Sequence, residues 1–193
     1  KAATALPDVA LAQFQFGQAL ERLGRKDEAA ARLRTAFELD GSAVLYRVVL
    51  ARVLVALDEC EEAGRLLDAA VAEAPRLALA HHVHGNLLAR LGDHTGAVAA
   101  QQQAIALDAT NASFHSALGR AYLAQGAAEK ALEAFEKATA INPKEGYLVY
   151  LLGQAQAELG MADQAAQAFA RAVELSPNNP TFRRALAELR PAD

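Results

Sequence analysis

Apolar residues recur along the whole chain at the three- and four-residue spacing of amphipathic helices, in short blocks separated by turn residues. In the segment 112–145, Leu118 and Tyr122 belong to one apolar stripe, and Ala131 and Phe135 belong to a second. Side chains at this spacing lie on one face of an α-helix and can be buried together. The pattern therefore predicts two helices in this segment, joined by a short turn.

The helical blocks repeat with a fixed period of 34 residues, without a single insertion or deletion. Three columns of small residues keep this register: Gly17, Ala51, Gly85, Gly119 and Gly153; Ala29, Ala63, Ala97, Ala131 and Ala165; Ala36, Ala70, Ala104, Ala138 and Ala172. Small residues at a helix crossing allow two helices to approach closely, so these columns indicate the contacts between helices. The period divides the chain into five units: 10–43, 44–77, 78–111, 112–145 and 146–179.

Turn residues stand at fixed places in each unit. Gly24, Gly92, Gly126 and Gly160 follow the first predicted helix, where a left-handed backbone conformation is cheap only for glycine. Asp58 takes that place in the second unit. Prolines follow the second predicted helix of three units, in the turn to the next unit, where a missing amide donor does no harm: Pro75, Pro143 and Pro177.

These motifs resemble the tetratricopeptide repeat, a family of 34-residue helix–turn–helix units. The similarity is closest at Leu152-Gly153, Ala165, Phe169, Ala172 and Pro177, and it covers 170 of 193 residues, because five units of 34 are in register. The resemblance implies an all-α, right-handed superhelical solenoid of antiparallel helix pairs, with five full repeats and a C-terminal capping helix. One position departs from the family pattern, which has a bulky apolar residue early in each unit. Only Val149 is apolar there, and the other four units have polar residues: Gln13, Arg47, His81 and His115.

The two ends of the chain lie outside the five units. Residues 1–9 have the phase of a second helix, since residues 2–6 parallel residues 137–141. We therefore interpret them as the remnant of a preceding repeat and expect the array to continue upstream of Lys1. Residues 180–193 form a single predicted helix and a tail, and the charged outer face of that helix is typical of a solvating cap.

Composition and charge exclude several classes of function. The net charge is -4 without a run of Lys or Arg, so we expect no nucleic-acid partner. Hydrophobic residues make up 53% of the chain, but charges and glycines interrupt every apolar run, so we expect no membrane insertion. Cys60 is the only cysteine, so neither an internal disulfide nor a cysteine-based zinc site can form. The compartment stays open, with the cytoplasm favoured over the periplasm.

No catalytic motif is present: the chain has no glycine-rich phosphate loop, no nucleophile elbow and no metalloprotease helix pattern. We therefore predict a protein that is not an enzyme and that carries no cofactor.

The histidines are the one cluster that could bind a metal, because His81 and His84 share a helical face and His115 is the repeat equivalent of His81. Two further histidines complete the set: His82 and His94. The alternative, which we favour, is a hydrogen-bonded polar patch, since His84 replaces a core leucine and Gln101 replaces a core aromatic residue in the same unit.

By resemblance to the family, a partner peptide or helix lies against a stripe of the first helices that forms the inner wall of the superhelix. We refer to this stripe as the wall. Its candidate contact residues are Leu11, Phe14, Gln18, Leu45, Val48, Arg52, Val55, His82, Asn86, Arg90, Ser116, Arg120, Tyr147, Tyr150 and Gln154. The Lys/Asn pairs with which chaperone-tail members of the family hold a terminal carboxylate are missing from these positions, so that activity is not expected.

Two features of the wall suggest what binds there. The first two units place apolar residues on it, so either a partner or the chain itself must cover them. Arg52, Arg90 and Arg120 stand in the middle without an acidic residue in the same stripe, which favours a partner segment that bears carboxylates. The alternative is that these arginines pair with turn carboxylates such as Asp58 or Asp93.

The sequence thus predicts a non-enzymatic scaffold or adaptor that binds a peptide or helix of another protein in its concave groove. Two alternatives remain. The array is the recognition arm of a larger enzyme whose catalytic domain lies outside this segment, or it assembles with itself through the apolar wall of its first units.

Overall fold

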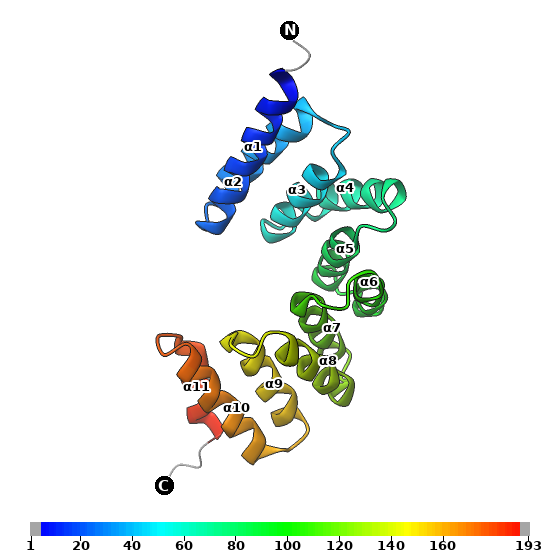
Figure 1. The fold of residues 1–193 in the computed structure, drawn as a ribbon. Helices are drawn as coiled ribbons and strands as arrows, with labels where there is room; N and C mark the ends of the chain where they lie inside the picture. The colour runs from blue at the N-terminus through cyan, green and yellow to red at the C-terminus, as the bar shows by residue number, and fades with distance from the viewer. Residues whose placement is uncertain (1–4, 190–193) are drawn as a thin grey trace. The chain divides into compact units, whose positions relative to one another are not determined.

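The computed structural model describes residues 5–189, and this span contains eleven α-helices and no strand (Figure 1). Short turns join each helix to the next. None of the helices in this span is both long and apolar enough to cross a membrane.

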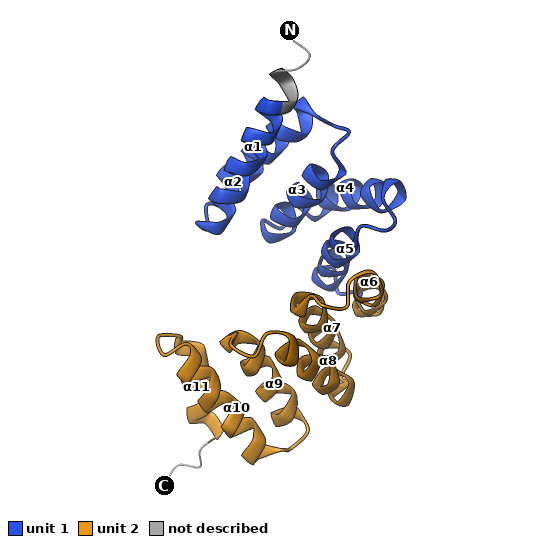
Figure 2. Cartoon of the chain, viewed as in Figure 1, with its two compact units in different colours: residues 1–93 blue, residues 94–193 orange. Residues whose placement is uncertain are grey.

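The chain forms two compact units, residues 1–93 and residues 94–193 (Figure 2). In unit 1 each helix packs on the next one, and α3 also contacts α5; the helices are α1 (Ala5–Arg22), α2 (Lys26–Leu39), α3 (Val44–Ala56), α4 (Cys60–Glu73) and α5 (Ala78–Arg90). In unit 2 each helix again packs on the next one, and α7 contacts α9; the helices are α6 (His94–Leu107), α7 (Ala112–Ala124), α8 (Ala128–Ile141), α9 (Gly146–Glu158), α10 (Ala162–Leu175) and α11 (Pro180–Leu189). The boundary between the units falls inside the third sequence repeat, after its first helix.

Helix starts coincide with the starts of the sequence repeats from the second repeat onward, at Val44, Ala78, Ala112 and Gly146. The first repeat differs, because α1 begins at Ala5 and runs through residue 10 without a turn. The boundary between residues 9 and 10 is therefore not a helix boundary in the structure. An additional repeat before the first one stays a prediction, since residues 1–4 lie outside the described residues.

Close helix crossings explain the column of small residues in the first helices. A Cβ atom added to Gly17 would stand 2.7 Å from Cγ of Leu33 on the paired helix. At Gly119 it would stand 2.5 Å from the ring of Phe135, and at Gly153 2.7 Å from the ring of Phe169. Separations this short are forbidden to real side chains, so the helices reach their packing distance only because these positions lack a side chain.

The turn inside each pair has the predicted left-handed residue. Gly24, Gly92, Gly126 and Gly160 have φ between 73° and 83°. Asp58 is the only non-glycine residue of the described span with positive φ, at 66°. The prediction that Asp58 takes a glycine's place is therefore confirmed, and it costs the chain some backbone strain.

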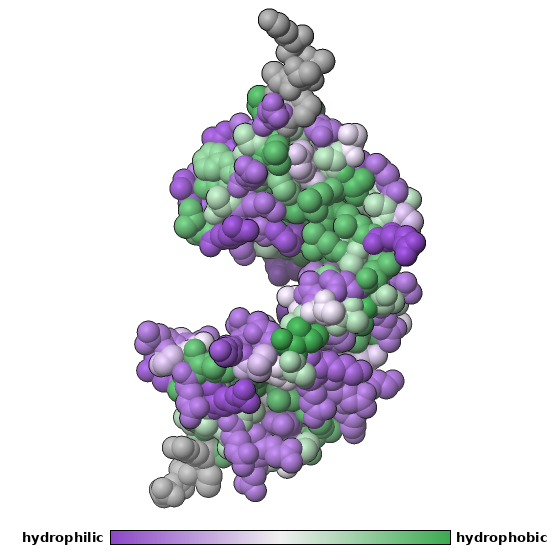
Figure 3. All heavy atoms as spheres, in the orientation of Figure 1, coloured by the Kyte–Doolittle hydropathy of each residue, from purple (hydrophilic) through white to green (hydrophobic). Residues whose placement is uncertain are grey.

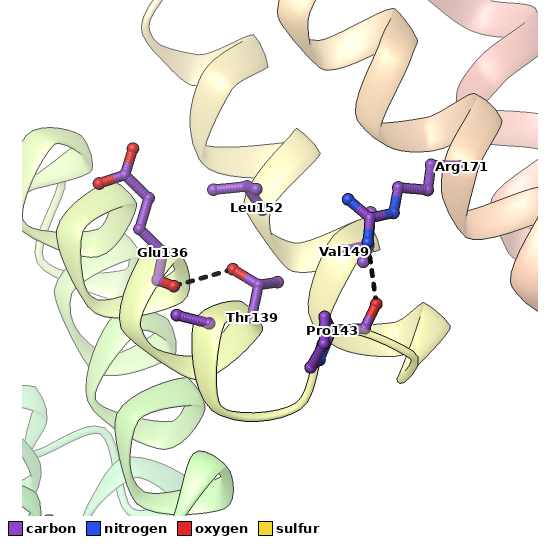
Figure 4. Close-up of a pocket in the computed structure, with 7 residues that line it drawn as sticks. Glu136, Thr139, Pro143, Val149, Leu152 and Arg171 are labelled. Atoms are coloured by element: carbon purple, nitrogen blue, oxygen red, sulfur yellow. Dashed lines mark hydrogen bonds between the residues drawn. The ribbon is translucent and has the colours of Figure 1, made fainter.

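A side chain donates to one carbonyl oxygen in each of four turns between repeats, and we call these contacts the turn clamps. They join Arg47 to Gly41 at 3.2 Å, His81 to Pro75 at 2.9 Å, His115 to Ala109 at 3.0 Å and Arg171 to Pro143 at 3.1 Å. The first three donors occupy the position at which the sequence departs from the family pattern. Val149 cannot donate, and at its turn Arg171 reaches over from α10 instead (Figure 4). The polar residues thus satisfy turn carbonyls that helix ends leave without a partner.

The two units bury different kinds of side chain. The core of unit 1 is mainly aliphatic, and α3 alone buries seven residues. On the face drawn in Figure 3, apolar residues gather in the region of α3 and α4. The cores of unit 2 are built around Phe135 and Phe182, with tyrosine rings packed against them.

Candidate interaction surface

Three of the apolar wall residues of unit 1 belong to its core. Phe14 is 5% exposed, Val48 0% and Val55 9%. The ring of Phe14 stacks on Tyr46 of α3, with ring centroids 4.4 Å apart. The chain itself therefore covers these side chains, and they cannot serve as partner contacts in this structure.

Two apolar residues of the unit 1 wall remain exposed. Leu11 on α1 is 45% exposed and Leu45 on α3 is 43% exposed. Leu45 is the second residue of α3, and Leu11 lies about one helical turn before the buried Phe14 in α1. The expectation of a broad apolar wall is thus corrected to two separate leucines.

Arg52 on α3 is held by a carboxylate of α1. It donates from Nε and Nη2 to the two carboxylate oxygens of Glu21, at 2.9 and 2.6 Å. The pair and its neighbours Gln18 and Arg22 line a cavity of about 410 Å³. A two-pronged contact of this kind satisfies the guanidinium and the carboxylate together, so Arg52 does not offer a free charge to a partner.

Arg90 is also paired, with the left-handed turn residue Asp58. Its Nε donates to Oδ1 of Asp58 at 2.5 Å, and a second nitrogen donates to the other oxygen. These hydrogen bonds hold the pKa of the Asp58 carboxyl below its usual value. The alternative of pairing with a turn carboxylate is therefore realised for Arg90, while Arg52 uses a carboxylate of α1. Two further wall residues, His82 and Asn86, lie half-buried on α5, with Nε2 of His82 and Nδ2 of Asn86 3.2 Å apart.

The wall of unit 2 is polar and more accessible. Arg120 on α7 is exposed and makes no ion pair or side-chain hydrogen bond within residues 5–189, and Ser116, one turn earlier, is half-buried. On α9, Tyr147 is 44% exposed and its ring stacks with Tyr150, with centroids 6.3 Å apart. Gln154 donates to the hydroxyl oxygen of Tyr150 at 2.9 Å.

Tyr150 packs against aromatic rings of the two helices that follow α9. Its ring stacks on Phe182 of α11 at 5.0 Å and packs against Phe169 of α10 at 5.6 Å. Because its phenol oxygen accepts from Gln154, its own O–H proton stays available to a ligand. Helices α7 and α9 thus present one unpaired cation and two stacked aromatic rings, of which Tyr150 is fixed by packing.

The three histidines of the candidate metal cluster have separate structural partners. His81 and His115 are turn clamps, and Nε2 of His84 lies 3.8 Å from a carboxylate oxygen of Asp68. Within the described span no three His, Cys, Asp or Glu side chains lie where they could share a metal ion. Gln101 is 1% exposed in unit 2, and a polar patch that joins it to His84 stays a prediction.

Comparison with known proteins agrees with this architecture. The chain is similar to a thermophilic TPR protein of Thermus thermophilus, with TM-score 0.85 and 21% identity over 93% of this chain and 98% of that one. It is similar to MamA of Desulfovibrio magneticus, with TM-score 0.70 and 22% identity over 90% of this chain and 98% of that one. A third similar structure is YrrB, described as a TPR protein with an unusual peptide-binding site, with TM-score 0.65 and 21% identity over 91% of each chain. No curated protein matches the chain.

Similarity at these identities shows the fold, and it confirms the predicted all-α fold of repeated helix pairs. Family models match the chain in three segments, two described as tetratricopeptide repeat at residues 14–78 and 122–189, and one as TPR repeat at residues 85–126. The matched segments leave only short stretches uncovered, and the chain belongs to the tetratricopeptide repeat family.

Proposed function

We propose that this protein is a non-enzymatic adaptor, and that the wall of unit 2 binds an acidic segment of a partner protein. Tetratricopeptide repeat proteins are typically interaction scaffolds, and YrrB is described as having a peptide-binding site. The family therefore supports protein binding in general. The choice of surface and of partner chemistry rests on the side chains of this chain.

The observation that carries the proposal is the exposed, unpaired guanidinium of Arg120 on α7, together with the stacked rings of Tyr147 and Tyr150 on α9, a helix that α7 contacts. Arginine and tyrosine are, with tryptophan, enriched among the residues that contribute most of the binding energy at protein interfaces. Arg120 can hold a carboxylate through two parallel hydrogen bonds. The rings offer flat apolar area that loses little conformational freedom on binding, because packing already fixes Tyr150.

Selection from a random peptide library on the immobilised protein tests this proposal. We expect selected peptides to carry Asp or Glu, and to bind Arg120→Glu at least about tenfold more weakly than wild type. Tyr147→Ala should weaken the same peptides about fivefold or more.

Lys144→Glu is the matched control, because it makes the same change of charge at an exposed turn residue of unit 2 that is not among the wall residues. It should leave the affinity unchanged. Selected peptides that lack acidic residues, or that bind Arg120→Glu as well as wild type, would contradict the proposal.

The structure bears differently on the two alternatives, self-association and a recognition arm of a larger enzyme. Self-association through the wall of unit 1 loses most of its apolar surface, since Phe14, Val48 and Val55 are buried. A role as the recognition arm of a larger enzyme is compatible with the proposed site and adds a catalytic partner domain to it.

A further inference from the structure

A second candidate site lies in unit 2, in the groove that α6, α7 and α8 form together. The structure has a cavity of about 410 Å³ there. Small-molecule sites in proteins span roughly 300–1,000 Å³, so this cavity has room for a small ligand or one terminal residue of a peptide. Its lining residues are Gln102, Ile105, His115, Leu118, Tyr122, Lys130, Glu133, Ala134 and Lys137.

This cavity is distinct from the wall. Leu118 and Tyr122 line the cavity, whereas Arg120 between them belongs to the wall. Side chains two residues apart on a helix point in nearly opposite directions, because each residue turns the helix by about 100°. A ligand in the cavity therefore lies on the other side of α7 from a peptide on the wall.

The same groove occurs one repeat later and serves as an internal comparison. A cavity of about 310 Å³ lies between α8, α9 and α10, and it is lined at equivalent repeat positions by Glu136, Thr139, Val149, Leu152 and Arg171 (Figure 4). Arg171 is the equivalent of Lys137. In the later cavity this cation donates to the carbonyl oxygen of Pro143, because Val149 cannot clamp that turn.

In the cavity between α6, α7 and α8, the equivalent cation, Lys137, does not contact the turn carbonyl. There His115 clamps the turn carbonyl of Ala109, so Lys137 is not needed for that contact. Neither Lys137 nor Lys130 makes an ion pair or a hydrogen bond within the described part of the chain, and Lys130 lies 5.8 Å above the ring of Tyr122. The lining holds two lysines against a single carboxylate, that of Glu133. One positive charge in the lining of the cavity is thus not compensated by a carboxylate.

A third donor faces the same space. Gln102 donates to the hydroxyl oxygen of Tyr122 at 3.1 Å, which leaves the Tyr122 O–H proton free to bind an acceptor. The remaining lining is apolar and comes from all three helices, with Ile105 from α6, Leu118 from α7 and Ala134 from α8. A lining that combines hydrogen-bond donors with hydrocarbon matches a ligand with both a carboxylate and an apolar body.

We propose that the cavity between α6, α7 and α8 binds a carboxylate that carries a small apolar group. Lys130, Lys137 and Tyr122 hold the carboxylate, and Ile105, Leu118 and Ala134 contact the apolar group. Such a ligand is either the C-terminal residue of a peptide or a free aliphatic acid, since both present the same chemistry to the cavity.

Three probes and the full chain test the proposal by nuclear magnetic resonance of backbone amides. N-acetyl-L-leucine represents a peptide C-terminus, 4-methylpentanoate a free acid, and N-acetyl-L-leucinamide the same body without the charge. We expect shifts at residues around Tyr122, Lys130 and Lys137, and binding of the amide at least about tenfold weaker than that of the acid. Binding of both acids identifies a general carboxylate site, and binding of N-acetyl-L-leucine alone identifies a peptide terminus.

The variant Lys130→Gln/Lys137→Gln should bind the acids at least about tenfold more weakly, and because both lysines are exposed the fold should persist. Arg120→Glu and Lys144→Gln should bind as wild type, which separates this site from the wall. Absence of shifts at the cavity with both acids, equal binding of acid and amide, or wild-type binding by the double variant would each overturn the proposal.

Discussion

The walls of the two units occupy the same repeat positions and yet offer different surfaces. In unit 1 the stripe turns into the core at Phe14 and Val48, and Arg52 is tied to Glu21. In unit 2 the equivalent positions hold Ser116 and Tyr150, with Arg120 exposed and unpaired within the described residues. Position in the repeat therefore determines where a side chain points, and the neighbouring helices determine whether a partner can reach it.

The largest expected difference between the walls is at their fifth repeat position. Phe14→Ala should lower the free energy of unfolding by about 3–4 kcal/mol, because it removes a buried ring that stacks on Tyr46. Ser116→Ala, at the equivalent position, should change it by less than about 0.5 kcal/mol. Urea unfolding followed by circular dichroism measures both. Similar losses in the two variants would show that the unit 1 wall is no more a part of the core than that of unit 2.

A smaller effect is expected where the first helices cross the second ones. Gly119→Ala should cost about 1–3 kcal/mol, because the new methyl group meets the Phe135 ring. Unit 1 has Ala51 and Leu67 at the equivalent positions, both fully buried. Adding Phe135→Leu to Gly119→Ala should therefore recover part of the loss. A double variant less stable than both single variants would contradict this account of the crossing.

The paired and unpaired arginines should differ by less. Arg52→Gln should lower the free energy of unfolding by about 1 kcal/mol or less, since it breaks a partly exposed ion pair with Glu21. Arg120→Gln should leave stability unchanged, because Arg120 has no ion-pair partner among the described residues. Thermal melts at low and high salt check this, since added salt should narrow the gap between the two variants. A larger loss for Arg120→Gln would mean that the unit 2 wall is also internally paired.

The smallest effect is expected at the left-handed turn residues. Asp58→Gly relieves a positive φ that Gly126 adopts freely in unit 2, and it should raise the melting temperature by about 1–3 °C near neutral pH. Arg90 lowers the pKa of Asp58, so this pair stabilises wild type above the ordinary Asp pKa and is lost as pH falls through the lowered one. The difference in melting temperature between Asp58→Gly and wild type should therefore grow as the pH falls from 6 to 3. A constant difference across that range would show that the ion pair contributes nothing.

The helix pairs and their turns could be predicted from the sequence because local rules determine them. Apolar spacing places the helices, and the left-handed turn requires Gly or, at one site, Asp58. The small-residue column was predictable for the same reason, since Gly17, Gly119 and Gly153 occupy one repeat position. The side chains that they face also share one repeat position: Leu33, Phe135 and Phe169. Each of these features depends on residues within a single repeat.

The state of the wall could not be predicted, because it depends on contacts between repeats. Glu21 stands 31 residues before Arg52, and helical spacing within one repeat does not bring them together. The structural role of the polar residues at the position that departs from the family pattern could have been predicted from the sequence. Arg47, His81 and His115 each follow the clamped carbonyl by six residues, and that constant spacing indicates a shared structural role.

The turn clamps also bear on how such an array can evolve. At three turns the donor comes from the helix that follows, and at the fourth Arg171 supplies it from a different column of the sequence. Once a second column provides the donor, the first is free to drift to an apolar residue such as Val149. Selection on the two columns is then epistatic, and recombination that separates them would produce a repeat with an unsatisfied turn. Repeats of this chain are therefore not freely interchangeable, even where their helices match.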